Sequence, residues 1–355
     1  MIDQLHQVAV KIDQLLANDD YPAQVRPGYL RDAVRYYPVR GGKRIRPALL
    51  IWSCGLLGGS EEAALYPAAA VEVFHNWTLV HDDIIDRDKT RRGAPTTHVK
   101  LTSELSSKFL ISALDVERCG QDFAILAGDL QQGWANDLLL RAVEHGVSPE
   151  VTVALARRLQ QLANCDLISG EALDVEFSIR GFADIDSQEI ITMLWLKTGA
   201  LLQFCTEAGA MIALKTANFK HPAVKSLSDF ALAVGIAFQL RDDYLDIFGD
   251  GKSFGKMPGN DLREGKATWI LLEALRLADT SMRDKLVGYI GLDSYTQAQL
   301  DDIRQILLDC GAVAACKAKG AKLLNQADEI LGTYPDNPYR QNLFDLTDFL
   351  SAWCK

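Results

Sequence analysis

Apolar residues recur at three- and four-residue intervals along most of the chain, which is the pattern of amphipathic helices. Strand-like alternation bounded by turns is nearly absent from the sequence. We therefore expect an all-α fold. The predicted helices cover residues 2–17, 47–58, 61–87, 121–145, 149–180, 187–214, 223–248, 266–278, 296–309 and 312–332.

The boundaries of these segments carry ordinary helix signals. Ser148 precedes Pro149 and Glu150, and Asp186 lies three residues before Glu189, so both sites predict an N-cap. No repeat, low-complexity tract or linker rich in Pro, Gly or Ser divides the chain, so we expect a single domain over residues 1–355. Residues 99–119 are the least regular part, and we expect a loop with a short helix there.

Composition narrows the class of protein. The chain has 355 residues, of which 48% are hydrophobic, enough for a sizeable core. Its net charge of −10 argues against nucleic acid as a partner. The seven cysteines include no CxxC pair, which favours reduced thiols and a cytoplasmic protein. No apolar run reaches the ~18 residues of a membrane span, so we expect no transmembrane segment.

An acidic motif, DDxxD, follows a long apolar helix at Asp82, Asp83 and Asp86. Asp82 and Asp86 share one helical face because they are four residues apart. Carboxylates packed in apolar surroundings are unfavourable unless a cation neutralises them, and oxygen ligands of this kind suit Mg²⁺. A single DDxxD is weak evidence, since it also fits a solvated acidic helix end.

The motif occurs again at Asp242, Asp243 and Asp246, with Gln239 on the same face. A glycine-rich loop follows, and it contains Lys252, Lys256 and Lys266. Lysines near metal-binding carboxylates suit phosphate capture, because each acts as a point charge. A polar surface loop is the plainer interpretation for Lys252, and it is less suitable for the two lysines that directly follow a glycine.

Two basic clusters complement the acidic motifs. Residues 40–47 read RGGKRIRP, and Arg91, Arg92 and Gly93 follow Asp86 closely. Either cluster alone could be a solvated turn. Together with the two acidic motifs they predict sites for two diphosphates, one held through Mg²⁺ and the other by cations alone.

With these motifs the sequence resembles the trans-isoprenyl diphosphate synthases of the polyprenyl synthetase family, over about residues 41–266. The resemblance is carried by GGKRIRP at 41–47, HNWTLVHDDIIDRDKTRRGAPTTH at 75–98, LAGD at 126–129, GEALDVEF at 170–177, LKTGAL at 196–201 and QLRDDYLDIFGD at 239–250. It implies a large helical bundle around a deep central cavity, usually as a homodimer.

The resemblance also implies roles for individual residues. Isopentenyl diphosphate would be bound by Lys43, Arg46, His75 and Arg92. Magnesium, as three ions that Mn²⁺ can replace, would be bound by Asp82, Asp86, Asp242 and Asp246. The allylic diphosphate would be held by Arg91, Lys197, Thr198, Gln239, Lys256 and Lys266. The allylic C–O bond would ionise, the isopentenyl double bond would attack the cation, and the released diphosphate would accept the proton.

Product length in this family depends on residues just before the first acidic motif. Trp77 lies five residues before Asp82, with Thr78 and Phe74 beside it in the sequence. A bulky residue at Trp77 resembles synthases that extend C5–C15 allylic substrates to C15 or C20 products. Ideal helix geometry instead places Thr78 closer to the face of Asp82, and ordinary core packing of Trp77 remains an alternative.

Three departures from the family pattern concern substrate choice. Glu171 stands where Gln is common, Trp195 precedes Leu196 where a smaller or basic residue is common, and residues 98–127 are longer than usual. A longer-chain synthase, a class I terpene cyclase and a non-catalytic regulatory subunit are the competing functions. Lys43, Arg46 and Arg92 argue against a cyclase, which needs one diphosphate site, and the intact acidic motifs argue against a silent subunit.

Overall fold

A computed structural model describes residues 2–110, 112–249 and 258–354. Helices make up most of these residues, and the strands among them are the two-residue β1 (Thr90–Arg91) and β2 (Ala94–Pro95), which pair antiparallel. The expectation of an all-α fold is therefore confirmed. The chain divides into two compact units, residues 1–157 with 205–221 and residues 158–204 with 222–355. The single domain and the central cavity stay predictions.

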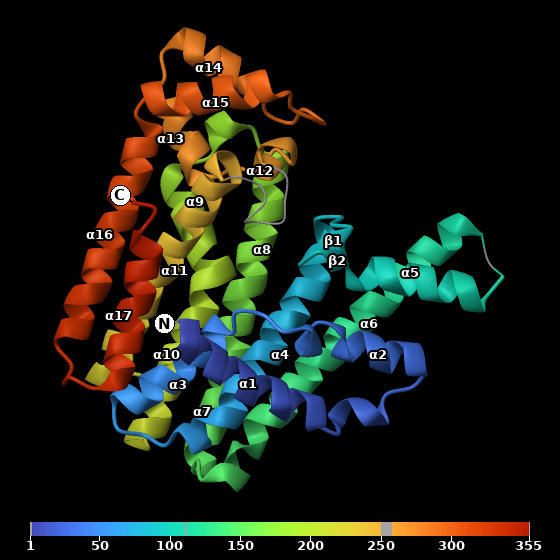
Figure 1. Cartoon of the computed structure of the whole chain (residues 1–355), viewed down its shortest axis with the longest axis vertical. Coiled ribbons are helices and arrows are strands. Elements are labelled where there is room, and N and C mark those ends of the chain that lie inside the picture. Colours follow the sequence, from blue (N-terminus) through green and yellow to red (C-terminus); the bar gives the residue numbers. More distant parts are fainter. Residues whose placement is uncertain (1, 111, 250–257, 355) are drawn as a thin grey trace. The chain divides into compact units, whose positions relative to one another are not determined.

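Unit 1 (residues 1–157 and 205–221) is built around α4, which packs against α3 and α6 (Figure 1). Its core includes Leu50, Phe74, Trp134 and Leu139, all fully buried. Its elements are α1 (Ile2–Asn18), η1 (Tyr21–Gln24), α2 (Gly28–Tyr36), η2 (Pro38–Arg40), α3 (Ile45–Leu56), α4 (Glu61–Ile85), β1, β2, α5 (Thr97–Lys108), α6 (Ala113–Leu140), η3 (Arg141–His145), α7 (Pro149–Arg158) and the second part of α10 (Ala200–Leu214).

Unit 2 (residues 158–204 and 222–355) is built around α11, which packs against α16, while α17 packs on α16 (Figure 1). Its core includes Phe177, Leu240, Ile270 and Ile303. Its elements are η4 (Leu159–Ala163), α8 (Asn164–Ile179), η5 (Phe182–Asp184), α9 (Ser187–Leu194), η6 (Trp195–Gly199), the first part of α10, α11 (Pro222–Phe248), α12 (Asn260–Arg263), α13 (Trp269–Leu277), α14 (Thr280–Val287), α15 (Gln297–Asp309), α16 (Ala312–Gly332) and α17 (Pro338–Ser351).

Side-chain caps start several of these helices. The Ser148 hydroxyl accepts a hydrogen bond from the Val151 amide at the start of α7, and Asp186 forms a capping box with Glu189 at the start of α9, so both predicted N-caps are confirmed. The prediction of a loop with a short helix at residues 99–119 was wrong, because most of the described residues there are helical. Residues 99–108 belong to α5 and residues 113–119 to α6, and Leu101, Leu105 and Val116 are buried where these two helices pack together.

Helix α11 is the one helix among the described residues that is long and apolar enough to cross a bilayer. Its most apolar window has a mean hydropathy of 1.3, but 61% of that window is buried inside the protein. The helix also ends in the second acidic motif. These features are typical of the core helix of a globular fold.

Candidate active site

The first acidic motif occupies the C-terminal turn of α4. Asp82 and Asp83 lie in the last turn, and Asp86 is the C-cap residue. A helix C-terminus carries partial negative charge, so carboxylates there are unfavourable unless a cation compensates them. The position of the motif therefore calls for positive charge from the protein, from a metal ion or from both.

Arg91 supplies part of that charge. Its Nε lies 2.5 Å from Asp83 Oδ1, and its Nη2 lies 3.3 Å from Asp82 Oδ2. Asp83 is fully buried and also accepts a hydrogen bond from the Tyr37 hydroxyl. Burial raises the pKa of Asp83 to about 6, although Arg91 and Tyr37 oppose the shift. Asp83 thus holds Arg91 in place, whereas Asp82 and Asp86 are the more accessible carboxylates.

The basic loop after η2 contacts the side chain of Arg92 through its two glycines. The Arg92 guanidinium donates to the carbonyl of Gly41, and a Cβ on Gly42 would lie only 2.9 Å from Arg92 Nη1. Gly41 also has a φ of +75°, which favours glycine. The paired glycines therefore let the backbone approach the guanidinium closely.

Arg46 and His75 lie beside this loop, with Arg46 Nη1 3.1 Å from His75 Nε2. Burial lowers the pKa of Arg46 and of Arg92; Glu72 opposes both shifts, and neighbouring arginines add to them. Burial and the same two arginines lower the pKa of His75 well below its usual value. Positive charges gathered this closely favour an anion between or beside them.

Arg44, in the same basic run, has a structural role instead. Its side chain is fully buried, forms an ion pair with Glu72, and lies 2.6 Å from Asp13 Oδ1. The sequence counted Arg44 among the cations of an anion site. The structure places it in an internal ion-pair network, so that cluster is smaller than expected. Lys43 is exposed.

An aromatic row lies along α4 before the first acidic motif. Phe74 and Trp77 are buried, and their ring centroids are 4.9 Å apart. Trp77 also packs edge-on against His81, whose Nε2 lies 3.2 Å from the Ile125 carbonyl oxygen of α6. A Cβ on Gly128 would come within 2.3 Å of His81, so a glycine at this position leaves room for the His81 ring. The hydroxyl of Thr78 donates to the His75 carbonyl.

The second acidic motif occupies the C-terminal part of α11, and its middle carboxylate is the most confined. Asp243 is buried, and its Oδ2 has no hydrogen-bond partner among the described residues. Burial raises the pKa of Asp243 well above its usual value, and four neighbouring carboxylates raise it further. These neighbours are Asp261, Asp242, Asp174 and Asp246.

Asp246 contacts the start of the segment that follows the glycine-rich loop, at residues 259–261. Its carboxylate oxygens accept hydrogen bonds from the backbone amides of Asn260, at 3.2 Å, and Asp261, at 3.1 Å. It therefore caps the short helix α12 and brings Asp261 into the acidic group. The sequence did not single out Asp261, although it lies in the glycine-rich segment that follows the second acidic motif.

Lys197 extends from a π-helical turn, η6, toward α8. Its Nζ lies 2.6 Å from Asp174 Oδ2 and 2.7 Å from Glu171 Oε2. A Cβ on Gly170 would come within 2.2 Å of the Lys197 amide nitrogen, so only glycine allows this approach of α8 and η6. Such π-turns are frequent at functional sites. Glu171, at a position where Gln is common in the family, therefore forms an ion pair with Lys197, as Asp174 does.

Several of these groups line a cavity of about 120 Å³ within unit 2. Lys266 Nζ lies 3.0 Å from Glu264 Oε2, and Thr198 is buried. Trp195 donates to the Gln203 side chain at 2.6 Å and thereby braces the π-turn. Lys252 and Lys256 lie outside the described residues. The cavity is lined by Asp174, Met193, Leu194, Lys197, Gln239, Asp243, Asp261, Lys266, Ala267 and Thr268.

The donor set of this cavity fits a divalent cation. A buried carboxylate with an unused oxygen, surrounded by four other carboxylates, would be relieved by bound positive charge. Among the described residues, no three such side chains already converge on one point as a preformed metal site. This arrangement suits Mg²⁺, which usually keeps several waters and uses one or two carboxylates together with substrate phosphates.

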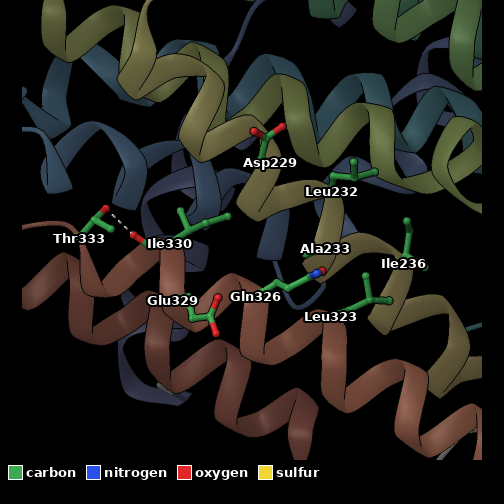
Figure 2. A pocket seen from close by; sticks show the side chains of 9 residues that line it. All are labelled: Asp229, Leu232, Ala233, Ile236, Leu323, Gln326, Glu329, Ile330 and Thr333. Carbon is green, nitrogen blue, oxygen red and sulfur yellow. Dashed lines mark hydrogen bonds between the residues drawn. The ribbon is translucent and has the colours of Figure 1, made fainter.

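A larger groove of about 550 Å³ lies between α11 and α16 (Figure 2). Its lining is mostly aliphatic, with Leu232, Ile236 and Leu323 along the groove and Asp229 and Glu329 as its acidic residues. Among the described residues that line it, none was predicted from the sequence for a functional site and none is basic. The smaller cavity is therefore the better candidate for phosphate chemistry, despite its size.

Comparisons with known proteins agree with the motifs. The polyprenyl synthetase family model matches residues 27–307. A short chain isoprenyl diphosphate synthase of Methanothermobacter thermautotrophicus is 31% identical over 92% of this chain and 91% of its own length. A geranylgeranyl diphosphate synthase of Sulfolobus acidocaldarius is 38% identical, covering 76% of this chain and 75% of its own.

A solved structure shows the same fold. It is the geranylgeranyl pyrophosphate synthase of Corynebacterium glutamicum, complexed with isoprenyl diphosphate and magnesium. It matches with a TM-score of 0.85 at 27% identity, over 99% of both chains. Fold, motifs and full-length relatives thus lead to one conclusion. This chain belongs to the polyprenyl synthetase family and is a short-chain isoprenyl diphosphate synthase, a magnesium-dependent prenyltransferase.

Proposed function

We propose that this enzyme condenses isopentenyl diphosphate with a C5–C15 allylic diphosphate and releases a C15 or C20 prenyl diphosphate. The buried aromatic row at Phe74 and Trp77 supports a short product, because bulky side chains leave little room for a long one. The similarity of this chain to the Sulfolobus acidocaldarius synthase, whose name denotes a C20 product, supports the same range of product lengths. Thr78, on the neighbouring face of α4, is the third residue that we assign to product length.

We assign isopentenyl diphosphate to the basic loop of unit 1. Arg46, His75 and Arg92 gather several positive and hydrogen-bonding groups in one place, and Lys43 adds an exposed ammonium group. Arginine binds phosphate oxygens through its planar fork of donors. The observation that supports the proposal most directly is the closeness of these side chains: Arg46 Nη1 lies 3.1 Å from His75 Nε2, and the positive charge of Arg92 lowers the pKa of both, which favours a bound anion.

We assign Mg²⁺ to four carboxylates, Asp82 and Asp86 in unit 1 and Asp242 and Asp246 in unit 2. Three ions, replaceable by Mn²⁺, are the proposed number. The groups proposed to hold the allylic diphosphate are Arg91, Lys197, Thr198, Gln239, Lys256 and Lys266. In the structure, Arg91 is paired with Asp82 and Asp83, and Lys197 with Asp174 and Glu171. Both cations would therefore exchange or share these carboxylates when diphosphate binds.

The proposed reaction follows from these assignments. When bound, Mg²⁺ stabilises the negative charge that develops on the departing diphosphate. Lys197 and Lys266 add point charges to the same group, while the aromatic side chains of Phe74 and Trp77 exclude water from the prenyl chain. The allylic C–O bond breaks, the isopentenyl double bond forms the new C–C bond, and the released diphosphate takes the proton.

We further propose that the enzyme is a cytoplasmic homodimer. The seven cysteines, all within the described residues, are free thiols, which is expected in a reducing compartment. The family resemblance supports the dimer. Analytical ultracentrifugation at micromolar concentration tests it, and a single species with the mass of one chain would contradict it.

The assignment of isopentenyl diphosphate is tested by Arg92→Ala, with Lys89→Ala as the matched control. Lys89 is an exposed cation in the same segment to which we assign no role. Removing a charge-assisted contact costs about 1.5–3 kcal/mol, so Arg92→Ala should raise the KM for isopentenyl diphosphate at least about tenfold. The KM for the allylic substrate should change far less.

Steady-state kinetics with each substrate varied in turn gives both KM values. A rise in the KM for isopentenyl diphosphate that is equal in the two variants would overturn the assignment. So would an Arg92→Ala effect confined to the allylic substrate. A terpene cyclase, the nearest rival, would consume the allylic diphosphate at a rate that does not depend on isopentenyl diphosphate.

A further inference from the structure

Two carboxylates of α8, Glu171 and Asp174, hold the ammonium group of Lys197 between them. Lys197 Nζ lies 2.7 Å from Glu171 Oε2 and 2.6 Å from Asp174 Oδ2. The side chains are partly buried, with relative exposures of 21% for Lys197, 17% for Glu171 and 12% for Asp174. Ion pairs at this depth are screened less by water and salt than pairs on the open surface. We call these three residues the lysine clamp.

Packing fixes the backbone on both sides of the lysine clamp. The π-turn η6 packs against α8, and a Cβ on Gly170 would come within 2.2 Å of the Lys197 amide nitrogen. Trp195, in the same turn, donates to the Gln203 side chain at 2.6 Å. Because the turn is held in place, Lys197 can exchange its partners by rotation of its own flexible side chain.

Glu171 gives the lysine clamp a surplus of negative charge. One lysine balances one carboxylate, so a neutral side chain at position 171 would leave the contact between Lys197 and Asp174 neutral. Like charges three residues apart on a helix repel each other, and Glu171 and Asp174 have this spacing. Both carboxylates therefore depend on the charge of Lys197, and together they hold it more strongly than either would alone.

The cavity beside the lysine clamp presents paired cations to an entering anion. Among the described residues that line it, Lys197 and Lys266 are basic, and Asp174, Asp243 and Asp261 are acidic. The ammonium group of each lysine lies within 3.0 Å of a carboxylate oxygen. A diphosphate that enters without a metal ion must therefore compete with carboxylates for both ammonium groups.

Positive charge bound in the cavity would change this competition. Burial raises the pKa of Asp243, and four neighbouring carboxylates, Asp174 among them, raise it further, so a cation is favoured within this acidic group. Its charge would also oppose the attraction between the carboxylates of the lysine clamp and Lys197. The ammonium group would then turn to a diphosphate at a lower cost.

We propose that Glu171 is a positioning residue that holds Lys197 away from diphosphate until a divalent cation is bound. Glu171 acts through the lysine and contacts no reacting atom. The inference rests on the proposed function in one respect, which is the assignment of Lys197 to the allylic diphosphate. Its consequence is that unit 2 captures diphosphate together with Mg²⁺ and discriminates against the metal-free anion.

Isothermal titration calorimetry with inorganic diphosphate tests the proposal on the full-length protein, in EDTA and in saturating Mg²⁺. Glu171→Gln keeps the size of the side chain and removes its charge. Without metal this variant should bind diphosphate at least about fivefold more tightly than the wild type, because Lys197 leaves one charged partner instead of two. With Mg²⁺ the affinities of the two proteins should agree closely.

Further variants locate the source of the effect. The matched control, Glu176→Gln, removes a carboxylate of the same helix that pairs with Arg180 at 3.2 Å, and it should bind diphosphate like the wild type. In a Lys197→Ala background, Glu171→Gln should give no gain in affinity, which a double-mutant cycle measures directly. Glu171→Ala should change the metal-free affinity in the same direction as Glu171→Gln. Binding of the probe at the basic loop of unit 1 is common to all variants and does not enter these differences.

Equal metal-free affinities of the wild type and Glu171→Gln would overturn the proposal. So would a gain of the same size in Glu176→Gln or in the Lys197→Ala background, since Glu171 would then act only as a remote charge. These outcomes are separate from the proposed function. An active synthase whose metal-free binding does not respond to Glu171→Gln would remove the role of Glu171 alone. The predicted binding pattern in a protein that incorporates no isopentenyl diphosphate would remove the proposed function alone.

Discussion

The pKa of His75 depends on the positive charges that surround it. Its imidazole is partly buried beside Arg46, within a group of arginines that favours the neutral ring. The sequence indicated that His75 belongs with the basic loop, because the resemblance assigned it there. It could not indicate the protonation state, which depends on arginines far away in the sequence.

This residue predicts a pH dependence of stability. In the unfolded chain His75 gains a proton as the pH falls through about 6.5, whereas the folded protein keeps it neutral to lower pH. The unfolded state then binds more protons, so stability falls on acidification, by at most about 1.4 kcal/mol per pH unit below that value. The variant His75→Gln should lose less stability than the wild type between pH 7.5 and pH 5.0.

Urea denaturation at both pH values measures the difference, with the exposed His6→Gln as a control. The control should follow the wild type. If His75→Gln and the wild type lose the same free energy of unfolding on acidification, His75 is not held neutral in the folded protein.

The middle residues of the two acidic motifs, Asp83 and Asp243, have different surroundings. Asp83 forms an ion pair with Arg91 and accepts from Tyr37, while Asp243 is surrounded by carboxylates. Both follow from the same DDxxD pattern, so the pattern alone could not distinguish them. The partner of Asp83, Tyr37, lies 46 residues away, and no local signal marks it.

At the scale of elements, the helical pattern predicted most of the architecture. Helices α1, α11, α15 and α16 lie where the apolar spacing places them, because each buries one face against a neighbour. The π-turn η6 was not predicted, because it arises from the close approach of α8 at Gly170 rather than from local propensity. The α5–α6 hairpin was missed because its buried positions are few.

The packing of Trp77 on α4 leads to a prediction about product length. Trp77 is buried in the aromatic row between Phe74 and His81. Replacing it by a smaller side chain should lengthen the product by at least one C5 unit. Because truncation to alanine at a buried aromatic position costs about 3–5 kcal/mol of stability, Trp77→Leu is the safer variant and Trp77→Ala the stronger one.

Reverse-phase chromatography of the products measures their length. Trp52→Leu, a substitution at another buried tryptophan on α3, is the matched control and should leave product length unchanged. Active Trp77→Leu enzyme with the wild-type product would show that Trp77 is ordinary core packing.

At the scale of the whole molecule, each unit carries one acidic motif at the C-terminal end of its central helix. Unit 1 adds the basic loop that we assign to isopentenyl diphosphate, and unit 2 adds Lys197 and Lys266. The sequence indicated both sets of residues and the family. It could not indicate that Arg44 is an internal ion-pair partner or that Asp246 caps α12, because both facts depend on contacts across the fold.

The most direct test of the account is the incubation of purified enzyme with Mg²⁺, labelled isopentenyl diphosphate and a C5, C10 or C15 allylic diphosphate. We predict incorporation of label into a C15 or C20 prenyl diphosphate, with loss of activity when Mg²⁺ is chelated. No incorporation with any of the three partners, from protein that is folded by circular dichroism, would contradict the account.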